Sequence, residues 1–251
     1  MELRDELIRL YLQTSKHSNY QILPRELAEI LKIDKKDILS TYEQERFDFI
    51  CSNISLKGKN ILDIGGNTGY FTFESFKRGC KHVDYYEGNQ LHAEFVSKAK
   101  PIFHADNIDV HPDYYLFDEN EKKYDVVFCL NVVHHLGDDF LNTGDMELAK
   151  RKMISCINQL ASTTDCLVFQ MGYNWCGNRN RCLFENGTKK EMEKFVADYT
   201  ENCWSIVDIG IAEKIGDNVV YKKLNVENNV RNNQLGEFLN RPLFIMKSKI
   251  V

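Results

Sequence analysis

The sequence predicts an α/β fold: a mostly parallel sheet covered by helices on both faces, with antiparallel strands at the carboxyl end and a helical extension at the amino end. Three observations support this fold class. Short apolar runs alternate with helical stretches over residues 60–171, and such alternation produces right-handed crossovers and a parallel sheet. After residue 205 the apolar runs follow one another with no clear helical interval, which indicates antiparallel strands. The first 55 residues show helical periodicity alone.

Residues 1–55 are predicted to form three helices. Their apolar side chains recur at helical spacing: Leu3, Leu7, Leu10 and Tyr11, then Leu27, Ile30 and Leu31 after Pro24, and then Phe47, Ile50 and Cys51 within 41–53. We expect residues 1–55 to be an N-terminal helical extension or lid, and residues 56–251 to be the main domain.

The main domain opens with the alternating elements. Its predicted strands are 60–64, 82–87, 108–111, 125–130 and 166–171, and its predicted helices are 70–78, 90–100 and 146–160. Another helix, 189–199, precedes the last predicted strands, which are 205–212, 219–224 and 243–247.

The charge balance bears on the kind of partner. The chain has 251 residues and a formal net charge of -5, and a net acidic chain is a poor match for nucleic acid. A small-molecule or glycan substrate is therefore favoured, and nucleic acid is not expected as a partner. No stretch approaches the roughly 18 apolar residues of a membrane span. The amino terminus carries charges where a signal peptide needs an apolar run, so we expect a cytoplasmic protein.

Two features bear on metal binding, and neither predicts a site. Cys176 and Cys182 are the closest pair among the eight cysteines, but their spacing does not match zinc motifs, and ordinary thiols are expected. Asp138 and Asp139 are adjacent carboxylates. A cation there would need further oxygen ligands from elsewhere, so a solvated helix start is the favoured interpretation.

A glycine-rich turn is the most informative motif. An apolar strand reaches Asp63 and runs through Gly65-Gly66-Asn67-Thr68-Gly69 into a helix. Glycine permits positive φ and lets a ligand approach bare backbone, and the helix start offers unpaired N–H groups. Glu87 ends the next strand, where a carboxylate can accept hydrogen bonds from ribose hydroxyls. Together these features predict a nucleoside-binding site.

These residues resemble the first motif of the class I S-adenosylmethionine-dependent methyltransferases, which have a Rossmann-like fold. Asp63, Gly65 and Gly69 match that motif, whereas Asn67 stands where glycine is usual; Asn tolerates left-handed backbone, and the neighbouring Gly66 adds freedom. The resemblance implies S-adenosylmethionine as cofactor. It also implies cofactor-binding roles for Asp63 (amino group), Gly65, Gly66, Asn67, Gly69 and Tyr70 (methionine end and loop), Glu87 (ribose), Asp113 (adenine) and Asn131 (beside the methyl group).

The segment from Phe128 to Leu136 contains two adjacent histidines and resembles the fourth motif of that family. The resemblance places His134 or His135 near the acceptor. A neutral histidine is a suitable base for a hydroxyl, and we favour His135 over His134. The alternative for each ring is packing beneath the adenosine or capping the helix.

The loop after the fifth strand is dense in aromatic and polar side chains. Ligands bind at the carboxyl ends of parallel strands in open α/β sheets, so this loop is expected to border the substrate. Tyr173 and Trp175 are candidates to stack on a sugar, and Arg179 and Arg181 to pair with phosphate or carboxylate. A solvated loop with aromatic anchors is the alternative.

Within the class, two segments of the chain resemble two different families. The segment from Leu56 to Tyr70 resembles the wobble-uridine tRNA carboxymethyl-transferring enzymes, and the His-His-Leu segment resembles bacterial polysaccharide methyltransferases. The acidic charge favours O-methylation of a sugar, sugar nucleotide or phosphate-bearing glycan precursor. A tRNA-modifying transferase is one alternative, and a non-catalytic protein that binds S-adenosylmethionine is another.

Overall fold

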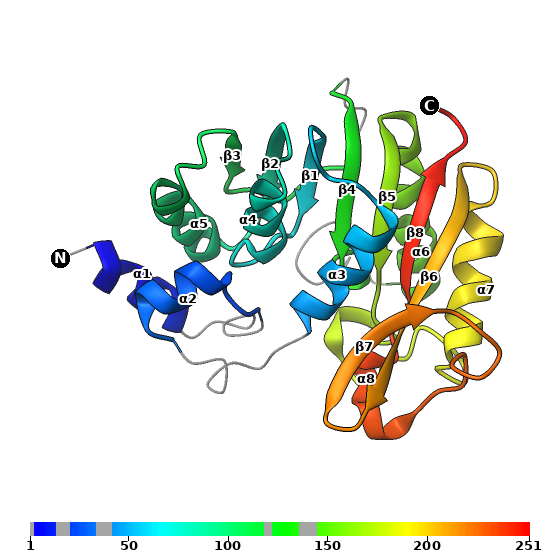
Figure 1. The fold of residues 1–251 in the computed structure, drawn as a ribbon. Helices are drawn as coiled ribbons and strands as arrows, with labels where there is room; N and C mark the ends of the chain where they lie inside the picture. Colours follow the sequence, from blue (N-terminus) through cyan, green and yellow to red (C-terminus); the bar gives the residue numbers. More distant parts are fainter. Residues whose placement is uncertain (1–2, 14–20, 34–41, 118–121, 136–144) are drawn as a thin grey trace. The chain divides into compact units, whose positions relative to one another are not determined.

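The computed structural model describes residues 3–13, 21–33, 42–117, 122–135 and 145–251 (Figure 1). Its contacts divide the chain into two compact units. Unit 1 comprises residues 1–47 and 55–115, and unit 2 comprises residues 48–54 and 116–251. The division predicted near residue 55 separates an N-terminal extension from a main domain. Each of the two units contains residues from both sides of residue 55, so they do not test that division, which stays a prediction.

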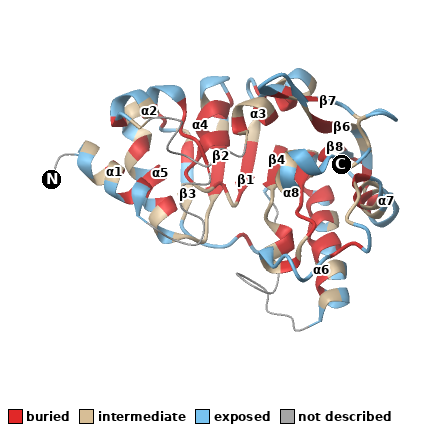
Figure 2. Ribbon diagram, turned by 90° about the horizontal axis from the view of Figure 1, so that it is seen from below, coloured by how far each residue is buried: buried red, intermediate tan, exposed pale blue. Residues whose placement is uncertain are grey.

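Unit 1 contains a parallel sheet. Its elements are α1 (Leu3–Leu12), α2 (Arg25–Leu31), β1 (Asn60–Ile64), α4 (Tyr70–Lys77), β2 (His82–Tyr86), α5 (Gln90–Phe103) and β3 (Ile108–His111). The strands pair in parallel in the order β3-β2-β1, so that Asp84 lies opposite both Leu62 and Asp109. The interior of β1 and β2 is buried (Figure 2), as expected for parallel strands with both faces covered.

Unit 2 contains the remaining strands. They are β4 (Tyr124–Leu130), β5 (Thr164–Gln170), β6 (Trp204–Ile215), β7 (Asn218–Lys223) and β8 (Leu243–Ser248), in the order β4-β5-β8-β6-β7. β4 and β5 are parallel, whereas β8 pairs antiparallel with both β5 and β6, and β7 pairs antiparallel with β6.

The helices of unit 2 lie between its strands in the sequence. They are η2 (Val133–His135), α6 (Met146–Gln159), η3 (Leu160–Ser162), η4 (Trp175–Gly177), α7 (Lys189–Thr200), η5 (Asn233–Leu235) and α8 (Gly236–Leu239). α7 begins at a capping box, in which Thr188 and Glu191 each bond the other's backbone N–H. The indole N–H of Trp204 donates to the carbonyl of Ile157 and ties β6 to α6.

α3 (Glu43–Asn53) contributes residues to both units, with 43–47 in unit 1 and 48–53 in unit 2. In unit 2, the Phe49 ring lies over Gly210 of β6, where an added Cβ would come within 2.7 Å of the ring. The same ring is 6.4 Å from the Tyr221 ring of β7. Gly210 therefore leaves the space that Phe49 fills.

The predicted fold class is confirmed: parallel strands alternate with helices, and the last strands are antiparallel. The predicted strands and long helices agree with the observed ones to within about three residues at most ends. β6 is longer than predicted because its hairpin with β7 continues to a turn at Gly216, which has a φ of 61°. The one-turn helix α8 was not predicted, since four residues are too few for a periodic pattern.

Within the described residues, no helix is both long enough and apolar enough to cross a membrane.

Candidate active site

The glycine-rich turn follows β1 in unit 1, and its backbone is left-handed at three alternate positions. The φ angles are 67° at Gly65, 52° at Asn67 and 82° at Gly69. Asn67 thus occupies the left-handed region where the family motif usually has glycine, and Asn is the non-glycine residue that accepts this region readily. Its side-chain Oδ1 accepts a hydrogen bond from the N–H of Thr68 at 2.8 Å, which holds the turn.

Gly66 is required for a different reason, because the space beside it is already filled. A Cβ at this position would lie 2.4 Å from the Tyr85 ring and 2.9 Å from Oδ2 of Asp63. The Tyr85 hydroxyl also donates to the carbonyl of Asn67. Tyr85, on the neighbouring strand β2, therefore contacts the turn and holds its conformation.

Glu87 lies directly after β2 and holds the same turn. Its Oε2 accepts from the N–H of Asn67 at 2.8 Å, and its Oε1 accepts from the N–H of Asn89 at 2.8 Å. The carboxylate is half-buried. This places an acceptor for hydroxyl groups at the turn, as the nucleoside interpretation requires.

Asp63 is buried beside the turn. The Thr72 hydroxyl donates to its Oδ2 at 2.6 Å. Burial raises the pKa of Asp63 to about 7, the nearby charge of Glu87 acts in the same direction, and the hydrogen bonds from Thr72 oppose it. An amino group bound here would favour the ionised carboxylate.

These residues fit the methionine and ribose parts of S-adenosylmethionine. The region offers a turn with left-handed backbone at Gly65, Asn67 and Gly69, a carboxylate that accepts hydrogen bonds at Glu87, and a buried carboxyl at Asp63 that can face a cation. Bound there, the cofactor supplies a methyl group on a positively charged sulfur.

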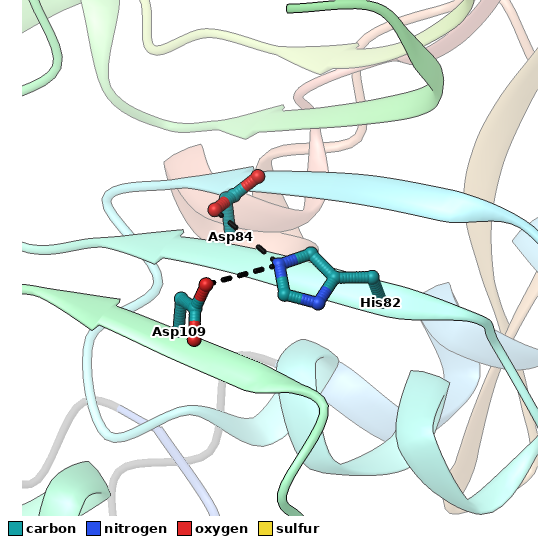
Figure 3. A group of neighbouring side chains, drawn as sticks. All are labelled: His82, Asp84 and Asp109. Carbon is teal, nitrogen blue, oxygen red and sulfur yellow. Dashed lines mark ion pairs between the residues drawn. The ribbon is translucent and has the colours of Figure 1, made fainter.

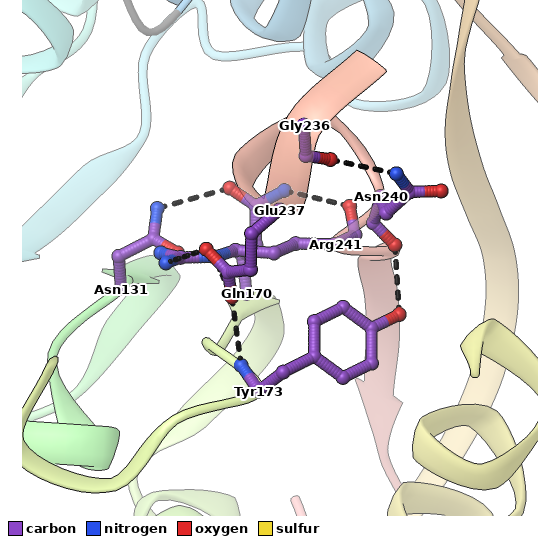
Figure 4. Close-up of polar contacts among 7 residues, drawn as sticks. All are labelled: Asn131, Gln170, Tyr173, Gly236, Glu237, Asn240 and Arg241. Atoms are coloured by element: carbon purple, nitrogen blue, oxygen red, sulfur yellow. Dashed lines mark hydrogen bonds and ion pairs between the residues drawn. The ribbon is translucent and has the colours of Figure 1, made fainter. Parts of the chain in front are cut away.

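In unit 2, a polar network joins the ends of β4 and β5 to the residues around α8 (Figure 4). Asn131 follows β4 with a left-handed φ of 63°. Its Nδ2 donates to Oε1 of Gln170 at 3.0 Å, and its Oδ1 accepts from Nη1 of Arg241 at 2.8 Å. Gln170 in turn donates to the carbonyl of Arg241 at 3.0 Å.

Glu237 neutralises Arg241 within this network. The Nε of Arg241 donates to Glu237 at 3.1 Å, and Oε1 of Glu237 also accepts from the N–H of Tyr173 at 3.0 Å. Burial acts to raise the pKa of Glu237, but the charge and hydrogen bonds of Arg241 outweigh it, so the pKa is lowered. The network contains one cation and one anion.

The two histidines lie beside this network. His134 is 2% exposed. A Cβ on Gly172 would lie 2.8 Å from Nε2 of His134 and 3.1 Å from Nη2 of Arg241. Glycine at 172 therefore allows both side chains to approach the end of β5. The His135 ring lies 4.3 Å from that of His134 and is more exposed.

Comparison with known proteins places part of the chain in a methyltransferase domain. The family model described as a methyltransferase domain matches residues 62–157. The tRNA U34 carboxymethyltransferase of Helicobacter acinonychis is 29% identical over 108 residues, which are 41% of this chain and 41% of that protein. The protein of the same name from Nautilia profundicola is 26% identical over 149 residues, 53% of this chain and 47% of that protein.

Residues 62–157 therefore match a methyltransferase domain, and the comparisons support the resemblance to the class I S-adenosylmethionine-dependent methyltransferases. A methyltransferase domain implies S-adenosylmethionine as the methyl donor, in agreement with the prediction from the motif. Over the whole fold, the bifunctional kinase-methyltransferase WbdD aligns with 96% of this chain and 46% of its own, at 12% identity and a TM-score of 0.55. The methyltransferase spans less than half the length of the two tRNA-modifying relatives. Because their names state tRNA, the expectation that nucleic acid is no partner is not supported.

Gln21 is a residue of this methyltransferase that the sequence patterns do not reveal. Its Oε1 accepts from the N–H of Tyr70 at 2.9 Å and from the hydroxyl of Thr68 at 3.2 Å. Gln21 is buried, and its carbonyl accepts from the Tyr11 hydroxyl at 2.9 Å. It therefore caps α4 from 49 residues away, where Gly69 has no side chain to do so.

Tyr70 and Asp113 occupy different surroundings from the rest of the predicted cofactor set. The Tyr70 side chain is buried, and its hydroxyl donates to Oε1 of Gln44 at 2.7 Å. Its backbone N–H donates to Oε1 of Gln21. Asp113 is exposed in the segment after β3. The cofactor roles of all these side chains stay predictions.

The two aromatic rings in the loop after β5 are buried, and they do not form an exposed surface on which a sugar could stack. Tyr173 and Trp175 are 3% and 1% exposed, and the Arg181 guanidinium lies 3.9 Å from the centre of a Trp175 ring. The Tyr173 hydroxyl donates to the carbonyl of Asn240 at 2.8 Å. The predicted stacking on a sugar would need these rings to be uncovered, and it stays a prediction. Arg179 and Arg181 are exposed.

The metal-related residues can be placed only in part. Cys176 and Cys182 are free thiols. Asp138 and Asp139 lie outside the described residues.

Proposed function

We propose that this methyltransferase transfers a methyl group from S-adenosylmethionine to a sugar hydroxyl of a glycan precursor. The observation that carries the proposal is the charge-balanced network of Asn131, Gln170, Glu237 and Arg241 at the ends of β4 and β5. Amide, guanidinium and carboxylate groups offer both donors and acceptors. An uncharged acceptor rich in hydroxyls makes use of both kinds.

The charge of this network also bears on which part of the acceptor it holds. Arg241 already pairs with Glu237, with Nη2 and Oε2 in contact. A phosphate group placed there would meet the Glu237 carboxylate, which disfavours it. We assign any phosphate of a sugar nucleotide to the exposed Arg179 and Arg181, since guanidinium groups bind phosphate well.

In this proposal the residues act mainly by positioning. Asp63, Glu87 and the Gly65–Gly69 turn hold the cofactor, and Asn131 and Arg241 orient the acceptor. His135 would take the proton of the acceptor hydroxyl, and S-adenosylmethionine bound at the turn would supply the methyl group and leave as the neutral thioether. Proximity and alignment supply most of the rate, and a base adds to it because a sugar hydroxyl is weakly acidic.

A second candidate substrate is tRNA. The names of the relatives from Helicobacter acinonychis and Nautilia profundicola favour it. The alignments' coverage of less than half of those proteins weakens the transfer of a substrate, because the remaining half can determine what is bound.

An acceptor screen separates the two candidates. S-adenosylhomocysteine release is measured with sugar nucleotides, sugar phosphates and unmodified tRNA under the same conditions. We expect turnover with a sugar-bearing acceptor, and Arg241→Met to raise its KM at least tenfold while the affinity for S-adenosylhomocysteine stays the same. Arg25→Met is the matched control, since Arg25 is exposed and pairs only at the surface. Turnover with tRNA alone would overturn the glycan proposal.

A further inference from the structure

His82, Asp84 and Asp109 form a side-chain cluster on two neighbouring strands of the unit 1 sheet (Figure 3). His82 and Asp84 are two residues apart on β2, and their side chains therefore share a face. Asp109 on β3 is the register partner of Asp84. The sheet itself thus brings one imidazole and two carboxylates together.

The distances within the cluster are too long for hydrogen bonds of good geometry. Nε2 of His82 lies 3.5 Å from Oδ1 of Asp84 and 3.4 Å from Oδ2 of Asp109. This nitrogen is buried and makes no hydrogen bond within the described part of the chain. One ligand atom from each residue lies within 4.8 Å of those of the other two.

These separations match the edges of a metal coordination shell. Zinc bonds to nitrogen and oxygen are about 2.0–2.2 Å, so adjacent ligands in a tetrahedral shell lie about 3.4 Å apart. We propose that His82, Asp84 and Asp109 bind a divalent transition-metal ion such as Zn²⁺, through Nε2 and one oxygen of each carboxylate. Water molecules complete the coordination shell. The ion enters the site from the solvent beside Asp109, whose side chain is 58% exposed.

The strand register makes a cation useful at this position. Asp84 is 2% exposed, and it faces Asp109 directly across the strand pair. Like charges opposite each other destabilise a sheet, and a buried carboxylate is costly without a compensating charge. A divalent ion at this position would offset both carboxylates at once.

His111 supports the same site from outside it. Its Nε2 lies 3.2 Å from Oδ1 of Asp84, so its N–H can donate to the carboxylate oxygen that is nearest His82. The His111 ring stacks on Tyr86 at 4.2 Å, which fixes its orientation. Groups that orient a metal ligand in this way strengthen binding.

The site is independent of the proposed function. His82 is the first residue of β2 and Asp109 the second of β3, whereas Glu87 follows the last residue of β2. We therefore assign the ion a structural role, joining β3 to β2, and not a role in methyl transfer.

Cobalt binding to the full chain tests the proposal. The protein is freed of metal with a chelator, dialysed, and titrated with Co²⁺ while visible absorption is recorded, and with Zn²⁺ in a thermal melt. We expect one equivalent of Co²⁺ to give ligand-field bands without the thiolate charge-transfer bands of a cysteine site. Zn²⁺ at about 100 times its Kd is expected to raise the Tm by about 5–10 °C.

Variants then identify the ligands. We expect His82→Asn and Asp109→Asn each to weaken Co²⁺ binding by at least about 100-fold, and His111→Asn to weaken it by about 10-fold. His104→Asn is the matched control, because His104 is exposed and has a left-handed φ of 52° that Asn also accepts. Absence of stoichiometric binding to the wild-type chain would overturn the proposal and leave His82 as an ion-pair partner of the two carboxylates. Binding that His82→Asn and Asp109→Asn both retain would also overturn it.

Discussion

The side-chain oxygen of Gln21 accepts a hydrogen bond from the backbone N–H of Tyr70, the first residue of α4, at 2.9 Å. A helix start needs acceptors for its free N–H groups, and a side chain from the preceding residue usually provides one. Here the preceding residue is Gly69, which the turn requires for its left-handed φ of 82°. Gln21 in the N-terminal segment therefore provides the acceptor that the glycine cannot, and its hydrogen bond joins that segment to the glycine-rich turn.

Removing this cap should weaken cofactor binding. We expect Gln21→Ala to lower the free energy of unfolding by about 1–2 kcal/mol, because two buried donors lose their acceptor. We also expect it to raise the Kd for S-adenosylhomocysteine severalfold, measured by calorimetry. Gln21→Glu keeps an oxygen at the helix start, where negative charge is favourable, and should restore most of the affinity. Gln13→Ala, at an exposed position, serves as the control; equal Kd values for all four proteins would contradict a positioning role.

Gly66 and Gly58 offer a matched pair of substitutions near the same strand. Gly66→Ala places a Cβ 2.4 Å from the Tyr85 ring, and such overpacking costs about 1–3 kcal/mol. Gly58→Ala meets nothing within 4 Å but is strained at a φ of 73°, at a cost of about 1 kcal/mol. We expect only Gly66→Ala to abolish S-adenosylhomocysteine binding, as judged by thermal shift. Similar loss in both variants would mean that general destabilisation, and not the shape of the turn, governs binding.

Local sequence patterns were sufficient for the elements and insufficient for the long-range contacts. The glycine turn and the carboxylate of Glu87 are predictable because strand, turn and helix signals lie next to each other. The bond from Arg241 to Asn131 spans 110 residues, and neither the one-turn helix α8 nor a single arginine has a periodic signal. Tyr173 and Trp175 were identified by residue type, which cannot distinguish a ring packed under Arg181 from one that is open to a sugar.

Asp63 should make stability depend on pH in a specific direction. Its pKa is about 7 in the folded chain against 3.8 for the free side chain, so the folded state holds this proton more tightly. The resulting stabilisation is full below pH 3.8 and is lost as the pH rises to about 7. Between pH 5.5 and 7.5 we expect the wild type to lose about 2 kcal/mol that Asp63→Asn does not lose. Urea unfolding at both pH values measures this difference, and parallel curves for the two proteins would refute it.

Arg241 and Glu237 should be coupled energetically. Each is partly buried, with side chains 14% and 28% exposed, so removing one leaves the other with an uncompensated charge. We expect Arg241→Gln and Glu237→Gln each to lower the free energy of unfolding by about 2 kcal/mol, and the double variant to lose less than the sum by at least about 1 kcal/mol. A double-mutant cycle by chemical denaturation gives the coupling. Additive losses would show that the pair does not act as a unit.

His134 and His135 should separate into a structural and a chemical role. His134 is 2% exposed and lies against Gly172, so we expect His134→Gln to lower stability by about 1–3 kcal/mol. His135 is more exposed. If it is the base, His135→Gln lowers kcat for a hydroxyl acceptor by about 10²–10⁴-fold, with little change in the Kd for S-adenosylhomocysteine. The pH–rate profile of His135→Gln should also lose the rise that accompanies deprotonation of the base. Full turnover by His135→Gln would remove this residue from the mechanism and leave alignment of the acceptor as the source of the rate.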